Sequence, residues 1–116
     1  MNNPEREMFE RKDYYCSLLS FYGSLLPKMT YQRMSQFYLD DLSITEIAQN
    51  QNVSRNAVFE SIKIGEKRLD EYEKMLGLRR KKSEEIEFVN DILAADTVQK
   101  KDELLNKWKG ELENGI

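Results

Sequence analysis

The side chains best suited to recognition chemistry stand together at the start of one amphipathic segment, as Ser54, Arg55 and Asn56. An arginine can donate two hydrogen bonds to guanine, and an asparagine can make a similar two-point contact with adenine. A serine hydroxyl suits a phosphate oxygen. If these residues begin a helix, they predict a surface that reads DNA bases from the major groove. The further candidates for that surface are Phe59 among the bases and Lys63, Lys67 and Arg68 on the backbone.

Catalytic and metal chemistry is poorly represented in the sequence. It contains no histidine, which is the commonest general acid or base and the commonest zinc ligand. The single cysteine, Cys16, has no histidine to activate it, and its apolar neighbours indicate a small core residue. The carboxylates fall at spacings typical of helix surfaces, and no glycine-rich phosphate loop is present. We therefore expect a protein that is not an enzyme and that binds no metal or cofactor.

The opening residues, MNNPEREMFERKD, are charged and lack the apolar stretch of a signal peptide. No apolar run approaches the roughly 20 residues that a membrane-spanning helix needs. One cysteine also cannot form a disulfide within the chain. These features together lead us to expect a cytoplasmic protein without a membrane span.

Apolar residues recur at helical spacing along most of the chain, and no segment shows the period of two that a half-buried strand needs. The sequence therefore predicts an all-α fold. A first helix is expected over 8–26, ended by Pro27, and Thr30 is expected to cap a second. The predicted inner faces of these helices are Tyr14, Leu18, Phe21, Tyr22 and Leu25, and then Tyr31, Met34, Phe37 and Tyr38.

Residues 44–62 have the features of a helix-turn-helix. Ser43 and Glu46 form a predicted capping box at the start of a helix that ends near Gln51. Asn52 tolerates the left-handed conformation that a tight turn needs, and Ser54 then caps the next helix. A small residue is required where the two helices cross, and apolar residues must close the corner. The residues predicted to be buried at this crossing are Ala48, Val53, Val58 and Ile62.

The helix that follows Ser54 is predicted to be long, because its apolar stripe runs for about six turns to Leu76. We divide the chain into a core domain (1–76), a basic hinge (77–82) and an acidic helical extension (83–116). Ser83 is expected to begin the first helix of the extension, and Asp96 with Gln99 the second. The predicted inner faces are Ile86, Val89, Ile92 and Leu93, and then Val98, Leu105, Trp108 and Leu112.

Several sequence segments between Tyr14 and Leu76 resemble one bacterial family. They are FYGSLL at 21–26, YLDDLSITEIA at 38–48, VSRNAV at 53–58 and the IK…EKRLDEYEKML run over 62–76. The region is similar to region 4 of bacterial sigma factors and, more closely, to the small YlxM-type helix-turn-helix proteins. The resemblance implies a bacterial regulatory protein with a sigma region 4-like core and a C-terminal two-helix extension. It also implies a link to the signal recognition particle pathway, which the family's gene neighbourhood suggests.

The charge distribution leaves two functions open. The net charge is −3, and between Ser54 and Arg68 four basic residues stand against two acidic ones, which is little for a surface that binds phosphates. The first function is a transcription regulator that binds DNA through the helix starting at Ser54. The alternative is an interaction adaptor for protein or RNA components of the signal recognition particle pathway, built on the same scaffold.

The assembly state is also open at this stage. The two helices of the extension can fold back as a hairpin that covers their apolar faces. Alternatively, the long helix that ends at Leu76 and the C-terminal helices hold a homodimer, which would place two recognition helices side by side. We expect the homodimer, because each chain offers little positive charge.

Overall fold

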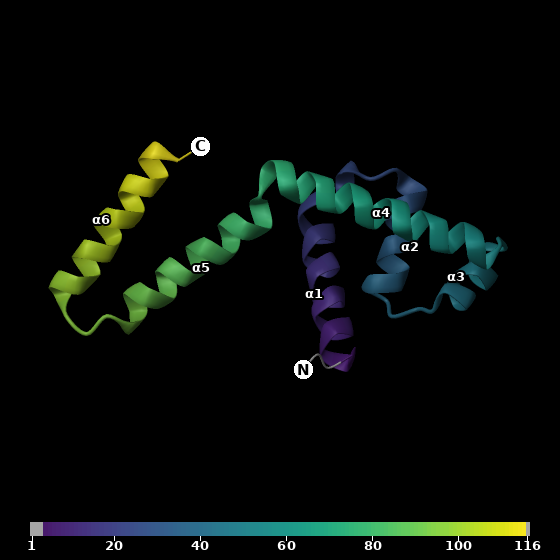
Figure 1. The fold of residues 1–116 in the computed structure, drawn as a ribbon, viewed down its shortest axis with the longest axis horizontal. Helices are drawn as coiled ribbons and strands as arrows, with labels where there is room; N and C mark the ends of the chain where they lie inside the picture. Colours follow the sequence, from purple (N-terminus) through teal and green to yellow (C-terminus); the bar gives the residue numbers. More distant parts are fainter. Residues whose placement is uncertain (1–3, 116) are drawn as a thin grey trace. The chain divides into compact units, whose positions relative to one another are not determined.

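The protein is described by a computed structural model of residues 4–115, in which every regular element is helical (Figure 1). This confirms the predicted all-α fold. The elements are α1 (Pro4–Tyr22), a short 3₁₀ helix η1 (Gly23–Leu25), α2 (Lys28–Tyr38), α3 (Ile44–Gln51), α4 (Arg55–Leu76), α5 (Leu78–Ala94) and α6 (Val98–Asn114). The chain divides into two compact units, Met1–Arg79 and Arg80–Ile116.

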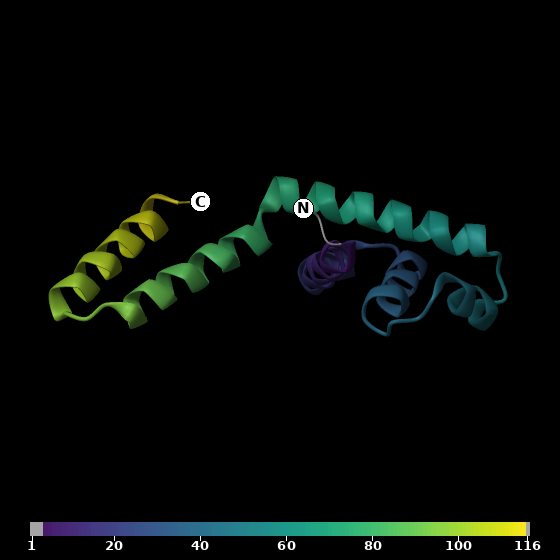
Figure 2. The same cartoon turned by 60° about the horizontal axis from the view of Figure 1, so that its bottom comes forward.

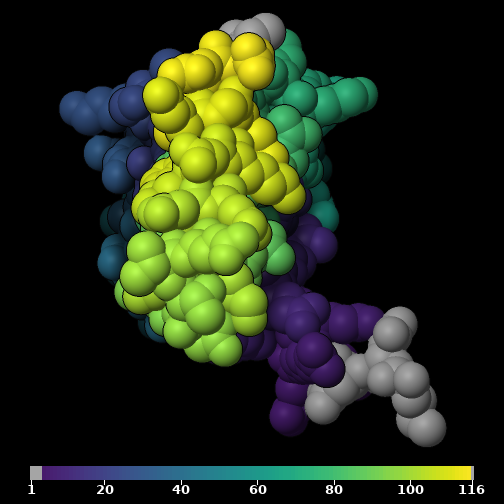
Figure 3. Space-filling view, turned by 90° about the vertical axis from the view of Figure 1, so that its left-hand side faces the viewer, coloured from purple at the N-terminus to yellow at the C-terminus, as the bar shows by residue number. Residues whose placement is uncertain are grey.

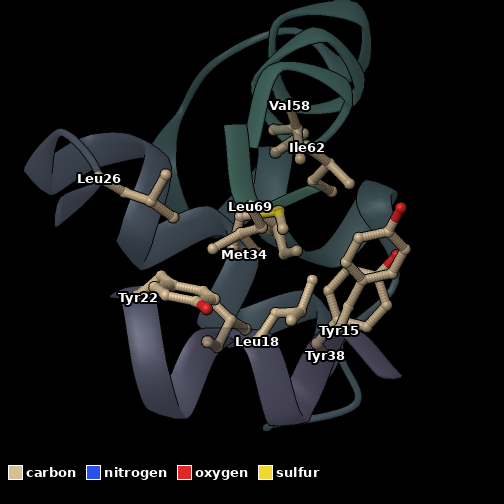
Figure 4. Packing of buried hydrophobic residues seen from close by; sticks show 12 residues of the cluster. Tyr15, Leu18, Tyr22, Leu26, Met34, Tyr38, Val58, Ile62 and Leu69 are labelled. Atoms are coloured by element: carbon tan, nitrogen blue, oxygen red, sulfur yellow. The ribbon is translucent and has the colours of Figure 1, made fainter. Parts of the chain in front are cut away.

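In the first unit, α4 lies across α1, α2 and α3 and closes a single hydrophobic core (Figures 1 and 2). Met34 of α2 is fully buried and lies between α1 and α4 (Figure 4). Gly65 permits this close approach, because a Cβ atom at that position would lie 2.7 Å from the Met34 Cγ. The other buried apolar residues of the core are Tyr15, Leu18, Leu19, Tyr22, Leu26, Tyr38, Ile47, Ala48, Val58, Ile62 and Leu69.

The helix-turn-helix forms as its local signals predict. The Ser43 side chain and the Glu46 side chain cap each other's backbone at the start of α3, in a complete capping box. Asn52 takes the left-handed conformation (φ 54°, ψ 49°) and ends that helix. The N–H of Asn52 bonds to the carbonyl of Gln49, and the next N–H bonds to that of Ala48, which is the Schellman arrangement. Backbone N–H groups of the turn therefore bind carbonyl groups at the end of α3.

One of the four residues predicted to be buried at the crossing is not. Ala48, Val58 and Ile62 are buried, whereas Val53 is 37% exposed. The turn uses the backbone N–H of Val53, at 3.0 Å from the Ala48 carbonyl oxygen, and leaves its side chain at the rim. The corner is instead filled from α3 by Ile47, which is fully buried.

The first two helices differ from the prediction at their ends. The first begins at Pro4 and ends at Tyr22, with η1 completing the predicted range and leaving Leu25 exposed. The second begins at Lys28 with Pro27 at its N-cap position, so Thr30 lies within the helix and does not cap it. The fixed φ of proline suits the start of a helix, but proline has no side-chain acceptor, so α2 begins without a side-chain cap.

The start of α5 also differs from the prediction. Gly77 ends α4 with a positive φ of 61°, and α5 begins directly at Leu78. The Leu78 N–H donates to the Tyr22 hydroxyl at 3.0 Å, and the Arg79 N–H donates to Glu73 at 3.1 Å, so α1 and α4 supply the cap. The basic residues 79–82 consequently lie inside a helix, and the start expected at Ser83 is about one turn late. The domain division at 77–82 stays a prediction.

The start of α6 is displaced by one residue from the prediction. Thr97 is the N-cap, and its hydroxyl accepts the Lys100 N–H at 3.1 Å. Asp96, the expected cap, instead forms an ion pair with the Lys100 side chain at 2.9 Å. The Thr97 hydroxyl binds the N–H three residues further on, so Thr97 caps the helix and the predicted box of Asp96 with Gln99 does not form.

In the second unit, α5 and α6 form a hairpin, seen from one side in Figure 3. Phe88 of α5 stacks on Trp108 of α6 with ring centroids 6.1 Å apart. Ile92 and Leu104 are half-buried beside this pair. The predicted inner faces are therefore largely wrong, since only Ile92 and Trp108 of those residues are even half-buried. The others are exposed: Ile86, Val89, Leu93, Val98, Leu105 and Leu112.

Candidate nucleic-acid interface

The predicted recognition residues lie at the exposed N-terminal end of α4. The Ser54 hydroxyl oxygen accepts the Ala57 N–H at 3.0 Å and caps the helix, which confirms its predicted structural role. Its hydroxyl hydrogen is left for an acceptor outside the helix, such as a phosphate oxygen. Arg55 and Asn56 follow in the first turn, and both are exposed. The start of this helix also carries the positive end of the helix dipole, which favours an anion.

The crossing of the two helices adds residues that the sequence did not single out. Arg55, Asn56 and Phe59 line one shallow hollow, whose other wall consists of Ile44 and Thr45 from α3. Thr45 is exposed and brings a second hydroxyl to this surface. Nothing in the local sequence marks these two residues, because their proximity to α4 arises only when the helices pack.

Two of the predicted backbone contacts share a face with this hollow. Asn56, Phe59, Lys63 and Lys67 follow one another at steps of three and four residues, so they lie along one side of α4. The Lys63 ammonium is 5.4 Å from the centroid of the Phe59 ring. A cation over an aromatic face is attracted to it, which holds the two side chains together.

The third predicted backbone contact, Arg68, lies on a different face. Successive residues of a helix are rotated by about 100°, so the neighbour of Lys67 points well away from the row that Lys63 belongs to. Arg68 is exposed, and it does not join the hollow or the lysine row. The structure therefore separates it from the other candidates.

The acidic residue Glu66 is largely buried beside this surface, and its Oε1 atom lies 3.8 Å from the Lys63 ammonium. It is 5% exposed, and its Oε2 atom accepts hydrogen bonds from Arg11 Nη2 at 2.7 Å and from the Tyr38 hydroxyl at 2.5 Å. Burial and then the hydrogen bond to Glu66 raise the pKa of Tyr38, so its hydroxyl stays protonated and donates. The bond to Glu66 likewise raises the pKa of Arg11.

This burial changes the charge that a ligand would meet. Of the two acidic residues between Ser54 and Arg68, Glu60 is exposed while Glu66 is buried and paired. The guanidinium of Arg11 that neutralises it is 55% exposed. Arg11 thus adds a positive charge that the count over 54–68 does not include, and Glu66 is shared between Arg11 and Lys63.

Further along α4 the acidic residues are held by tyrosines of α1. The Tyr15 hydroxyl donates to Asp70 at 3.0 Å, and the Tyr22 hydroxyl donates to Glu73 at 2.8 Å. A tyrosine hydroxyl carries no charge, so the bond from Tyr15 fixes the Asp70 carboxylate without neutralising it. The positive part of the helix is thus limited to its first four turns, which are also the turns that carry the recognition residues.

The orientation of the recognition helix is fixed by a side chain that the sequence analysis missed. Arg33 of α2 donates through Nε to Gln51 of α3 at 2.8 Å and through Nη1 to Ser61 of α4 at 2.6 Å. One guanidinium therefore ties three helices together next to the turn. Its partners lie 18 and 28 residues away, so no local pattern could have identified them.

The structure of residues 4–115 also bears on metal binding and on membrane insertion. No group of three or more potential ligands among cysteine, aspartate and glutamate is placed to hold a metal ion in this range. The helices described there also include none with the length and apolar character to cross a membrane.

Comparison with known proteins agrees with the geometry. Residues 9–108 match the model of a family described as "Putative helix-turn-helix protein, YlxM / p13 like". Similar proteins include the UPF0122 proteins of Bacillus cereus (strain AH187) and Bacillus anthracis (strain A0248). Each is 46% identical over 74 residues, which cover 64% of this chain and 67% of the relative.

Proposed function

Since this chain belongs to the YlxM/p13-like family of helix-turn-helix proteins, we propose that it is a non-catalytic regulatory protein that binds double-stranded DNA through the first turns of α4. The observation that carries the proposal is the exposed set of Arg55, Asn56 and Phe59 at the end of α4 that follows the turn. In helix-turn-helix proteins this end of the second helix enters the major groove.

Each residue has a role that its chemistry supports. Arg55 suits guanine and Asn56 suits adenine, each through a pair of hydrogen bonds. The exposed ring of Phe59 suits the methyl group of thymine. Hydroxyls at the helix starts, from Ser54 and Thr45, suit phosphates and would set the register of the protein on the duplex.

The number of phosphate contacts limits the affinity of one chain. Lys63 and Lys67 are the basic residues that share the face of Asn56 and Phe59 in the first turns of α4. Each neutralised phosphate contributes about −0.9 to the slope of log K against log salt, so two or three contacts give weak binding at physiological salt. We therefore propose that the DNA-binding form is a homodimer, in which two recognition helices act together.

The test is a binding titration with a duplex selected from a random library, followed by fluorescence anisotropy at two salt concentrations. Arg55→Ala should lower discrimination between the selected and a scrambled duplex by about 1–3 kcal/mol. Lys63→Ala should weaken binding to both duplexes alike and reduce the salt slope by about 1.

Arg68→Ala is the matched control, because it removes an exposed positive charge from the same helix but from another face. It should leave the discrimination unchanged and affect the salt slope less than Lys63→Ala does. If no sequence is enriched, or if Arg55→Ala binds the selected duplex as wild type does, the base-reading role is refuted.

A second candidate is an adaptor that binds a protein or RNA component of the signal recognition particle pathway. The observation that favours it is the short extent of the positive face, combined with the apolar Ile44 and Phe59 in the hollow. The same titration with signal recognition particle RNA and with its protein subunit separates the candidates. Saturable binding to one of these, with none to DNA, would replace the first proposal by the second.

A further inference from the structure

The hairpin of α5 and α6 carries more apolar residues than its own contact uses. Phe88 of α5 stacks on Trp108 of α6, and Ile92 and Leu104 are half-buried one turn nearer the connecting loop; we call these four residues the inner seam. A second set of apolar residues lies about 100° around each helix from the inner seam, which is the rotation between successive residues. This outer stripe consists of Ile86, Val89, Leu93, Val98, Leu105 and Leu112, which are between 41% and 76% exposed.

The outer stripe lies on one flank of the hairpin. Ile86 and Val89 line a shallow hollow together with Trp108, Lys82 and Glu85, so the stripe of α5 borders the exposed edge of the tryptophan. Leu105 and Leu112 precede and follow that tryptophan by three and four residues, which places them along the same edge. The opposite flank is charged and is lined by Asp91, Asp96, Lys100, Glu103 and Lys107.

The hairpin buries little of its own apolar surface. No described residue of α5 or α6 is fully buried. The six side chains of the outer stripe expose on the order of 100 Å² each, so the patch reaches the upper end of what monomers expose, roughly 300–600 Å². It also approaches the roughly 800 Å² that each partner contributes to a specific interface.

We propose that the outer stripe is a dimer interface, and that it packs against the outer stripe of a second copy of this chain to form a four-helix bundle. The inference rests on the homodimer of the proposed function and identifies the surface that forms it. Each helix of a four-helix bundle contacts two neighbours and therefore needs two adjacent apolar stripes, which is what α5 and α6 present.

The spacing of the stripe supports another pair of helices as its partner. Val98, Leu105 and Leu112 are seven residues apart, and so are Ile86 and Leu93. A seven-residue repeat is typical of helices that pack lengthwise against a second helix with the same repeat. A second copy of the hairpin supplies two such helices.

The edges of the stripe are compatible with self-association. On α5 the far side of the stripe is bordered by the uncharged Ser83 and Asn90, and Lys82 and Glu85 beside Ile86 and Val89 carry opposite charges. On α6 the bordering residues have both signs, with two basic and two acidic side chains: Lys101, Lys109, Asp102 and Glu113. Two copies would therefore not bring blocks of like charge together, although the unit as a whole is acidic.

The test is light scattering on the full chain, without nucleic acid, over a concentration series. Wild type should have twice the 13.8 kDa mass of one chain at low micromolar concentration. Val89→Glu combined with Leu105→Glu should raise the dissociation constant by about 100-fold or more, because each change buries a charge at the centre of the interface. Circular dichroism should show the same helix content for both proteins at a concentration where wild type is dimeric.

Ala94→Glu is the matched control, since it places the same side chain on the charged flank. It should remain dimeric. A monomeric mass for wild type throughout the series, or a dimer that survives the double substitution, would overturn the inference. This measurement contains no DNA, so its outcome does not depend on the binding titration. If the chain is dimeric here but binds no DNA in the titration, the DNA-binding proposal is refuted and this interface stands.

Discussion

The buried carboxylate of Glu66 is the most informative residue to change. In Glu66→Ala, the Tyr38 hydroxyl loses the acceptor at 2.5 Å and is left buried among apolar side chains. Arg11 loses a contact at 2.7 Å, but its guanidinium is 55% exposed and can be hydrated. Losing the hydrogen bond from Tyr38 therefore costs more free energy of unfolding than losing the one from Arg11.

The magnitude follows from that difference. An unsatisfied buried hydroxyl costs about 1–3 kcal/mol. Breaking a fully buried ion pair costs about 3–5 kcal/mol, but losing the Arg11 contact costs much less because its guanidinium is largely exposed. We expect Glu66→Ala to reduce the free energy of unfolding by about 2–3 kcal/mol, which corresponds to roughly 10–20 °C in Tm for a domain of this size.

The assay is urea unfolding followed by circular dichroism, with Glu60→Ala as the matched control. Glu60 is an acidic residue of the same helix, but it is exposed, so its replacement should change the free energy by less than about 0.5 kcal/mol. Helix propensity changes equally in both variants and cancels. If the unfolding midpoints of the two variants coincide, Glu66 does not hold α1, α2 and α4 together as described.

Three further predictions concern the same unit. Ala48→Leu should overpack the helix crossing and cost about 1–3 kcal/mol; a thermal melt that matched wild type would remove Ala48 from that crossing. Asn52→Val should be destabilising by about 1–2 kcal/mol, because a β-branched residue is strained at φ 54°, whereas Asn52→Gly should be tolerated, as urea midpoints would show. Burial, with hydrogen bonds to carboxylates, raises the pKa of Tyr15 and Tyr38 above the ordinary value of about 10. The folded state then holds these protons more tightly than the unfolded chain, so their contribution is complete below about pH 10 and is lost as the pH rises above it. Urea midpoints should fall between pH 8 and pH 11, and less so in Tyr15→Phe; an equal fall in both proteins would exclude Tyr15 as a cause.

The sequence by itself determined the parts of this protein that short-range interactions decide. The ends of α3 and the start of α4 were predicted correctly, because Ser43, Glu46, Asn52 and Ser54 satisfy backbone groups within three or four residues of themselves. The length of α4 followed in the same way from an unbroken apolar stripe that ends at Gly77. These local rules were sufficient to place Arg55, Asn56 and Phe59 in the first turns of one helix.

Tertiary structure decided which of several similar helix faces is buried and which stays exposed. In the sequence, Glu66 counts as an acidic residue against the positive charge of α4. Its burial is favourable only because Arg11 and Tyr38, from other helices, donate hydrogen bonds to its carboxylate. Thr45 joined the candidate site because α3 crosses α4 beside Asn56. In α5 and α6 the apolar residues fill two adjacent stripes, and periodicity is satisfied by either of them. The stacking of Phe88 on Trp108 selects one stripe for the hairpin and leaves the other exposed. Local sequence cannot predict this choice, because the packing of the helices decides which side chains meet.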